Sequence, residues 1–453
     1  MNKFYISGML LFVWIWCGVA MALDHGTGYI PGPDMSNLEQ AWTSVGKEPK
    51  ATFHWVDDMT PVEDQGLTNT CWCFASNHTL EAMININEGS FTDDFSEDSL
   101  ADCTYPGGSS YGGSHWRAAG YFSGIGPVSE TCQPWFPSTT DCLSCPQLNY
   151  RLKTMRTIAP STAAIKAALV DGPVATAMDA TGGTAEDFNG YNDGILTNGS
   201  PNVTDHAVII VGYNEGASSD PLYPDGNYWI CKNSWGTSWG RDGYFLIEYG
   251  AAMIGEENAQ FMEWENAPSS MGAVIDYADE NGPDGWTTQS GYNTLYICQR
   301  IVPSINGEIT EVQWANIGNN FDWEIRIYDG FSSGVPLSSL MTPMTNSSPE
   351  PYGGLITKEL TTPVSVTAGN DVYVCIALNN PTGNDFPVDV FGPNSGGGYA
   401  SLTSITSGYS SFPKDFCVRI KVFNPNFDMP STGPIGLLVL LAGMGGLIYW
   451  RKK

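Results

Sequence analysis

Residues 65–76 read Gln-Gly-Leu-Thr-Asn-Thr-Cys-Trp-Cys-Phe-Ala-Ser, and the predicted fold depends on them. A glycine marks a turn, and apolar residues then recur at helical spacing from Cys71 until Gly89. Cys71 is therefore expected at a helix N-terminus, with Asn69 or Thr70 as the cap. Unpaired N–H groups and the helix dipole favour negative charge there, so we expect a thiol of lowered pKa. Such a thiol ionises to a thiolate, which is the nucleophilic form.

Two later stretches carry polar residues that can act with this thiol. Residues 203–213, Val-Thr-Asp-His-Ala-Val-Ile-Ile-Val-Gly-Tyr, place His206 at the start of an apolar strand. Residues 228–244, Tyr-Trp-Ile-Cys-Lys-Asn-Ser-Trp-Gly-Thr-Ser-Trp-Gly-Arg-Asp-Gly-Tyr, place Asn233 at the end of another. With the first stretch, these motifs resemble the papain-like cysteine peptidases in composition and order, over roughly residues 51–265.

This resemblance implies an α+β fold of two lobes, one mainly helical and one mainly antiparallel sheet, with a cleft between them. It also implies four catalytic roles. Cys71 would be the nucleophile, and His206 would take its proton and later return it to the leaving amine. Asn233 would hold the other imidazole nitrogen, and Gln65 would donate to the oxyanion. The reaction needs no cofactor, and no metal is expected.

Four further residues are predicted to contact substrate or to shield the site. Gly112 and Gly113 resemble the family's segment that pairs with an extended peptide, for which glycine leaves room. Trp116 follows them, and Trp235 would shield the bond between His206 and Asn233 from water. Each residue type has an ordinary structural alternative: a flexible loop for the glycines and core packing for the tryptophans, the histidine and a free cysteine.

The sequence departs from the family pattern beside the nucleophile. A cysteine usual three residues earlier is Thr68, and its usual partner is Ser110 or Tyr111, so both halves of one disulfide are missing. Thr68 is expected to tie the loop by hydrogen bonding instead. Cys73 replaces a small apolar residue and is expected to be a buried thiol; metal binding by Cys71 and Cys73 is a remote alternative because no other ligands are clustered there.

Composition narrows the class of protein. The 453 residues carry 19 basic and 48 acidic side chains, for a net charge of −29, which excludes nucleic acid as an expected partner. The high aromatic and glycine content suits an exported, β-rich protein. An acidic run near residues 276–284 could suggest calcium, but its spacing matches no loop template, and a solvated turn is the better interpretation.

The two ends carry targeting signals. Residues 1–22 have the basic start, apolar centre and small residues of a secretory signal peptide. Residues 23–50 are too short for a folded pro-domain, although residues 37–45 could form a helix near the groove. Residues 429–453 combine a short motif, an apolar run and a basic end, as in surface-sorting tails that contact the membrane. We therefore expect an exported protein at the cell surface or outside the cell.

Residues 266–428 differ from the peptidase part in their sequence pattern. Short apolar runs alternate with turn clusters, which predicts an all-β sandwich. The expected strands are at residues 294–301, 309–314, 323–328, 355–360, 371–378 and 416–423. By position and architecture this part resembles the lectin-like sandwich that follows papain-like domains in some prokaryotic surface proteins, which implies a surface glycan as a further partner.

Eleven cysteines leave the disulfide pattern open. With Cys17 removed with the signal and Cys71 reserved, an odd number remains, so at least one more thiol lacks an intramolecular partner. Resemblance to the family suggests a bridge from Cys103 to Cys132, which would leave Cys142 for Cys145. In the sandwich, three cysteines (Cys298, Cys375 and Cys417) cannot all pair with one another.

These features together predict an exported cysteine endopeptidase that acts on proteins or peptides through an acyl-enzyme. One alternative is a surface adhesin or glycan-binding protein in which the peptidase domain is a scaffold. Another is an exopeptidase, in which the segment at residues 23–50 blocks one end of the cleft.

Overall fold

The computed structural model describes residues 25–32 and 51–426, except for positions 90, 105–106, 109, 125, 139–140, 267–272, 278–284, 289–293, 319, 380–384, 389–397, 402–403, 408 and 412–414. The predicted signal peptide (1–22), the helix suggested at 37–45 and the C-terminal tail (429–453) lie outside the described residues. Within the described ranges, no helix combines the length and apolarity that a bilayer crossing requires.

The helical lobe is built around α1 (Cys71–Glu88), as the sequence predicts. Thr70 is the N-cap residue, although its side chain makes no capping hydrogen bond, and the helix ends at Gly89, whose φ of 74° is left-handed. The first fourteen residues of α1 are buried, so it is the central helix of the lobe. Around it lie η1 (Val56–Asp58), α2 (Glu97–Asp102) and α3 (His115–Ser123).

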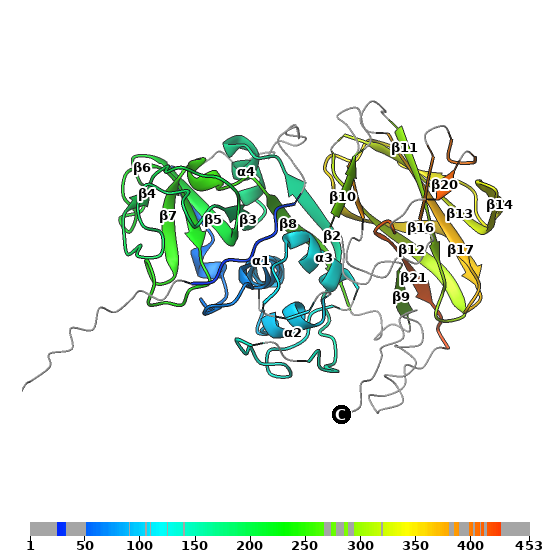
Figure 1. Ribbon diagram of the computed structural model, residues 1–453, viewed down its shortest axis with the longest axis horizontal. Helices are drawn as coiled ribbons and strands as arrows, with labels where there is room; N and C mark the ends of the chain where they lie inside the picture. Colours follow the sequence, from blue (N-terminus) through cyan, green and yellow to red (C-terminus); the bar gives the residue numbers. More distant parts are fainter. Residues whose placement is uncertain are drawn as a thin grey trace, which may run out of the picture.

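The second lobe is a largely antiparallel sheet. Its strands are β1 (Thr52–His54), β2 (Arg151–Ile158), β3 (Val174–Met178), β4 (Ile195–Leu196), β5 (His206–Gly216), β6 (Gly226–Lys232), β7 (Tyr244–Glu248) and β8 (Asn258–Glu265). They are ordered β4-β7-β6-β5-β3-β8-β2, with β1 paired to β5. The lobe also contains α4 (Thr162–Leu169), capped by Ser161, and η2 (Ala251–Met253). The α+β fold of two lobes is therefore confirmed (Figure 1).

The C-terminal part is the predicted sandwich, drawn from yellow-green to red in Figure 1. Its strands are β9 (Ala273–Tyr277), β10 (Gly285–Thr288), β11 (Thr294–Ile301), β12 (Gly307–Asn316), β13 (Asp322–Ser332), β14 (Val335–Ser339), β15 (Met344–Thr345), β16 (Gly354–Val366), β17 (Val372–Asn379), β18 (Asp385–Val388), β19 (Gly398–Ser401), β20 (Ser410–Ser411) and β21 (Val418–Phe423). Each of the six expected strands overlaps one of these. One sheet is ordered β16-β12-β21-β9 and the other β14-β13-β17-β11-β19-β20, with aliphatic residues and Trp314 in a shared core.

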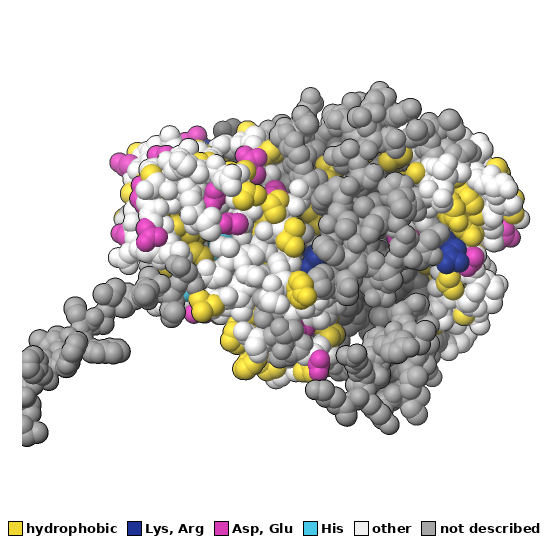
Figure 2. All heavy atoms as spheres, in the orientation of Figure 1, with side chains coloured by type: hydrophobic (Ala, Val, Ile, Leu, Met, Phe, Trp, Pro, Cys, Tyr) yellow, Lys and Arg dark blue, Asp and Glu magenta, His cyan; other side chains and the backbone are white. Residues whose placement is uncertain are grey.

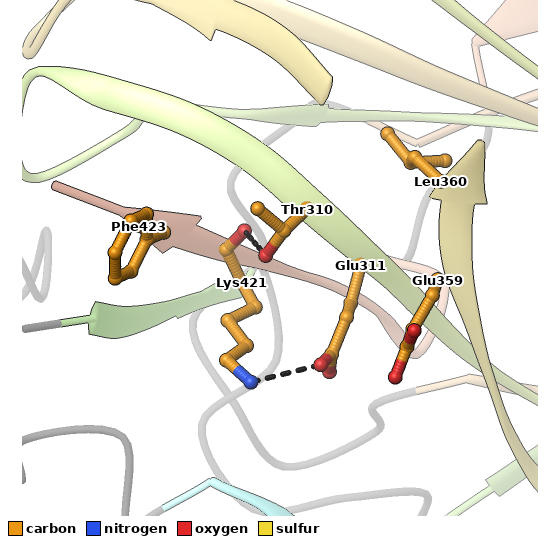
Figure 3. A pocket seen from close by; sticks show the side chains of 6 residues that line it. All are labelled: Thr310, Glu311, Glu359, Leu360, Lys421 and Phe423. Atoms are coloured by element: carbon orange, nitrogen blue, oxygen red, sulfur yellow. Dashed lines mark hydrogen bonds and ion pairs between the residues drawn. The ribbon is translucent and has the colours of Figure 1, made fainter. Parts of the chain in front are cut away.

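One sheet continues from the peptidase part into the sandwich. Strand β2 pairs with β8 on one side and with β16 on the other, where Met155 is opposite Leu355. Ion pairs support the junction: the Lys421 ammonium lies 2.8 Å from Glu311 and 2.9 Å from Glu265. A cavity of about 270 Å³ opens beside them (Figure 3). The two parts are thus joined by backbone pairing and charge, beyond the chain connection at residue 266.

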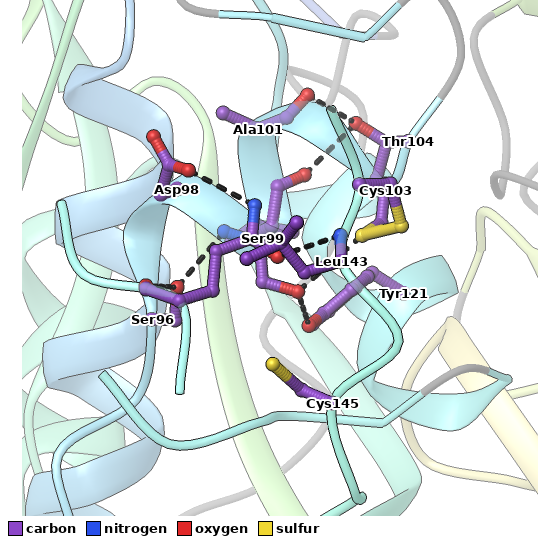
Figure 4. The surroundings of a disulfide bond; sticks show 12 residues. Ser96, Asp98, Ser99, Ala101, Cys103, Thr104, Tyr121, Leu143 and Cys145 are labelled. Carbon is purple, nitrogen blue, oxygen red and sulfur yellow. Dashed lines mark hydrogen bonds between the residues drawn. A yellow bond between two sulfur atoms is a disulfide. The ribbon is translucent and has the colours of Figure 1, made fainter. Parts of the chain in front are cut away.

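The disulfides correct the predicted connectivity. Cys103 is bonded to Cys142 (Figure 4), and Cys132 to Cys145, so the suggested bridges from Cys103 to Cys132 and from Cys142 to Cys145 are both wrong. The chain after Gln133 folds back, and the Leu143 N–H donates to the Gln133 side chain at 3.1 Å, which brings Cys142 to the end of α2.

In the sandwich, Cys298 and Cys375 face each other on β11 and β17 and are bonded. Cys417 takes no part in a disulfide with either of them. Cys73 is a buried thiol, as expected.

Peptide mapping of the non-reduced protein tests this connectivity. Because the Cα atoms of Cys103 and Cys142 lie 4.8 Å apart, and those of Cys132 and Cys145 lie 6.0 Å apart, cross-linked fragments should contain these two pairs. Both should disappear on reduction. A fragment that links Cys103 to Cys132 would contradict the fold of this loop.

Candidate active site

The nucleophile candidate lies at the junction of the two lobes. Cys71 is the first residue of α1, and its side chain is fully buried. Backbone amides of Ala207, Gly28 and Trp72 lie near its sulfur. The Ala207 amide belongs to the residue after His206, so the start of α1 meets the start of β5, as the predicted roles require.

The expected lowering of the thiol pKa is wrong for this state of the protein. Burial raises the pKa of the Cys71 thiol to about 12, and this outweighs the three N–H groups, which act in the opposite direction. The helix N-terminus is present as predicted, but the site is dry. Sequence alone could not reveal this because the burial comes from a segment far from Cys71 in the chain.

His206 and Asn233 form the predicted pair. Nε2 of His206 lies 2.8 Å from Oδ1 of Asn233, and the Ser234 N–H donates to the same oxygen at 2.9 Å. An oxygen that accepts from Ser234 also accepts from the imidazole, so the neutral ring carries its hydrogen on Nε2. Nδ1 then keeps a lone pair, and no described residue hydrogen-bonds to it. Burial lowers the pKa of His206 to about 4, which makes the neutral ring the resting form.

Aromatic rings cover this pair. The Trp235 ring lies 4.9 Å from the His206 ring, and Phe188 packs against Trp235 at 5.1 Å. Trp235 is 1% exposed and lies over the imidazole, so its shielding of the bond between His206 and Asn233 from water stays a prediction that this position fits. Gln65 is fully buried beside them: its Oε1 accepts from the Ser234 hydroxyl at 2.6 Å, which turns Nε2 toward the cleft.

Residues 25–32 occupy the cleft, drawn in dark blue in Figure 1. Gln65 Nε2 donates to the Gly26 carbonyl at 2.9 Å, and the Gly28 and Tyr29 N–H groups both donate to the Asp205 carbonyl at 2.9 Å. The His25 ring stacks on Trp235 at 4.6 Å. A peptide of the chain itself therefore fills the site.

Gly113 pairs with this segment through its backbone, as predicted for an extended peptide. It donates to the Gly28 carbonyl at 3.0 Å and accepts from the Ile30 N–H at 2.8 Å, in a parallel bridge. This close approach requires glycine at both positions. A Cβ on Gly113 would lie 2.4 Å from the Trp72 ring, and a Cβ on Gly112 would lie 2.2 Å from the Gly28 oxygen.

The Tyr29 side chain ends at a buried carboxylate that sequence reasoning missed. The Tyr29 hydroxyl donates to Glu257 Oε2 at 3.2 Å, the Thr204 hydroxyl donates to Oε1 at 2.7 Å, and the Gly32 N–H also donates to this carboxylate. Burial raises the pKa of Glu257 above its ordinary value. Glu257 immediately precedes β8 and belongs to no motif in the sequence, and Asp205 binds the segment through its backbone oxygen.

Two further predictions concern residues near the site, Trp116 and Thr68. Trp116 is 3% exposed and belongs to the same core cluster as Trp72, so its contact with substrate stays a prediction. Thr68 ties its loop by hydrogen bonding as expected, because its hydroxyl donates to the Gln65 carbonyl at 2.8 Å.

Comparisons with known sequences agree with this geometry. Residues 50–263 match the family model described as papain family cysteine protease, and residues 280–413 match the model described as lectin like domain. Papain from Carica papaya is 32% identical over 195 residues, which are 42% of this chain and 52% of the papain sequence. Cathepsin L2 from Homo sapiens is 34% identical over 198 residues, 42% of this chain and 57% of that sequence. The chain thus spans about half the length of these relatives.

A solved structure shares both parts of the fold. It contains the cysteine protease and lectin-like domains of Cwp84, a surface layer associated protein of Clostridium difficile. It superposes with a TM-score of 0.68 at 18% identity and covers 90% of this chain and 94% of that chain. Residues 50–263 thus match papain family cysteine proteases in sequence and share their fold with this structure. A lectin-like domain follows them in the same chain.

A valine at position 28 tests whether the segment covers Cys71 in solution. A Cβ on Gly28 would lie 2.3 Å from the Asn69 backbone oxygen, so Gly28→Val should displace the segment. We expect alkylation of Cys71 by iodoacetamide to become about tenfold faster or more, which corresponds to about 1.4 kcal/mol. Ile30→Val, at a side chain that is 42% exposed, is the matched control and should leave the rate unchanged. Equal rates in wild type and Gly28→Val would contradict the covering role.

Proposed function

We propose that the protein is an exported cysteine endopeptidase whose site consists of Cys71, His206, Asn233 and Gln65. The observation that carries this proposal is the orientation of His206. Its Nε2–H is committed to Asn233, which leaves the Nδ1 lone pair without a hydrogen bond from the described residues, and the amide of the next residue, Ala207, acts on the Cys71 sulfur. This is the arrangement a base needs in order to take a thiol proton.

The reaction then follows from these four groups. His206 Nδ1 takes the proton of Cys71, and the thiolate attacks the carbonyl carbon of a peptide bond. Gln65 Nε2, which here donates to a peptide oxygen, stabilises the oxyanion. The imidazolium returns its proton to the leaving amine, and water hydrolyses the acyl-enzyme. Asn233 keeps the imidazole in the required tautomer throughout.

Residues 25–32 make the described state latent under this proposal. The Gly28 amide lies beside the sulfur while its N–H donates to the Asp205 carbonyl, so the segment covers the thiol. Its departure admits water, which removes the desolvation that raises the thiol pKa. The amides of Ala207 and Trp72 then favour the thiolate.

Location and partners belong to the same proposal. Three disulfides favour an oxidising environment outside the cytoplasm. Acidic side chains are spread over the visible face of the peptidase part, and Lys and Arg are sparse there, which disfavours nucleic acid (Figure 2). The lectin-like domain is compatible with a surface glycan. A glycan binder with an inert peptidase scaffold is less favoured, because His206 is hydrogen-bonded to Asn233 and Gln65 donates to a peptide oxygen, as the reaction requires.

Replacement of the sulfur tests the mechanism directly. In the Gly28→Val chain, we expect Cys71→Ala to reduce cleavage of an unfolded protein substrate by at least about 10³-fold, because the nucleophile is lost. The matched control is Cys73→Ala, also a buried thiol of α1, which should keep most of the activity. Cleavage that survives Cys71→Ala would rule the mechanism out. Cleavage inside a long peptide, seen by mass spectrometry, separates an endopeptidase from an exopeptidase.

A further inference from the structure

A buried lysine links the two lobes behind the candidate site. Lys232 ends β6, one residue before Asn233, and its side chain is 1% exposed. Its ammonium donates to the carbonyl oxygens of Thr60 and Pro61 at 2.8 and 2.9 Å, and to Nδ1 of His78 at 2.9 Å. One side chain of the β lobe therefore satisfies three acceptors that lie outside that lobe.

These acceptors are tied to the residues of the proposed reaction. His78 lies on α1, about two turns after Cys71. Strand β6 pairs with β5, and Lys232 is opposite Ile209, close to His206 at the strand start. The lysine thus fixes the helix that begins with the nucleophile against the two strands that carry the imidazole and its partner.

The tautomer of His78 follows from this contact. An ammonium only donates, so Nδ1 accepts, and the neutral ring carries its hydrogen on Nε2. That nitrogen faces two carboxylates, Glu63 at 3.4 Å and Glu97 at 3.8 Å. Burial, and then the charge of Lys232, lower the pKa of His78 to about 4, so the ring is neutral near pH 7.

This tautomer argues against a metal at the same place. The ligand atoms of Glu63, His78 and Glu97 all lie within 4.8 Å of one another, a grouping that could hold a divalent cation. A ring nitrogen that carries a hydrogen cannot ligate a metal, and the lone pair on Nδ1 is directed at Lys232. The group is a hydrogen-bonded chain that runs from the lysine through the imidazole to the carboxylates.

Four acidic side chains surround the ammonium, and Glu63, whose pKa is lowered by His78 and Lys232 despite its burial, favours the charged form of the lysine. Burial lowers the pKa of Lys232 to about 8, and the carboxylates of Glu81, Glu63, Glu97 and Asp94 act in the opposite direction. Burial also raises the pKa of Glu97 well above its ordinary value. The lysine is therefore mostly an ammonium at neutral pH and can donate three hydrogen bonds.

We propose that Lys232 and His78 are positioning residues of the peptidase site, which set the placement of Asn233 and His206 relative to Cys71. The inference rests on the proposed function. Loss of the ammonium would leave two carbonyl oxygens and Nδ1 of His78 unsatisfied in a dry interior, so the end of β6 would shift and admit water. The peptide-binding backbone at Gly113 lies outside this contact, so binding of substrate should change less than its turnover.

The test compares variants in the full chain that carries Gly28→Val. Lys232→Met removes the donor, and His78→Leu removes the acceptor. We expect each to lower kcat by about tenfold or more, with KM changed less than about twofold. The pH profile for alkylation of Cys71 by iodoacetamide should move to higher pH, because a displaced imidazole stabilises the thiolate less. His78→Asn, whose Oδ1 can accept from Lys232, should restore both values to within about threefold.

Controls separate positioning from ordinary stabilisation. Lys166→Met removes a lysine of α4 that pairs with Glu215 away from the site, and it should change neither kcat nor the alkylation profile. A lower melting temperature for His78→Leu with an unchanged alkylation profile would overturn the proposal. If Lys232→Met does not fold, the two His78 variants decide. If the Gly28→Val chain cleaves no peptide, the proposed function fails, but the alkylation profile still tests the positioning.

Discussion

The structure depends on the contact between the starts of two elements, the first turn of α1 and the first residue of β5. Reactivity requires the Cys71 sulfur and the His206 ring to lie together, yet they belong to different lobes. Hydrogen bonds fix one side of the contact, since Asn233 and Ser234 settle the tautomer of His206. The buried Lys232 fixes the other side, because it holds α1 through His78. Without the hydrogen bonds of Asn233 and the contact of Lys232 with His78, each lobe would retain its core, but Cys71 and His206 would lose their relative placement.

The segment at residues 25–32 adds a second constraint, which is the absence of water. It brings backbone partners for Gly113, Asp205 and Gln65, so the polar groups of the cleft stay satisfied while the sulfur is dry. A dry thiol and a dry imidazole both remain neutral. The Cys71 thiol and the His206 imidazole would form an ion pair once the cleft opens, so the covered site contains the reactive groups in their neutral forms. The lectin-like sandwich continues the β lobe through β2 and leaves this arrangement intact.

Much of this could be predicted from the sequence, and the reasons are local. The helix at Cys71, the strands at His206 and Asn233, and the six sandwich strands follow from apolar periodicity and motifs. The disulfides of Cys103 and Cys132 were predicted wrongly because pairing depends on how one loop folds back. The raised thiol pKa and Glu257 were missed because each needs a contact between distant residues. A segment in the cleft was considered only as the exopeptidase alternative, in which residues 23–50 block one end.

Residues 25–32 keep the Cys71 thiol buried and neutral in the full chain. A pH titration of carbon-13-labelled cysteine, followed by nuclear magnetic resonance at the Cβ of Cys71, tests this claim most directly. The account predicts a neutral thiol through the neutral and moderately alkaline range in the wild-type chain, and a thiolate near neutral pH in the chain with a displaced segment. A thiolate signal near neutral pH in the wild-type chain would contradict it.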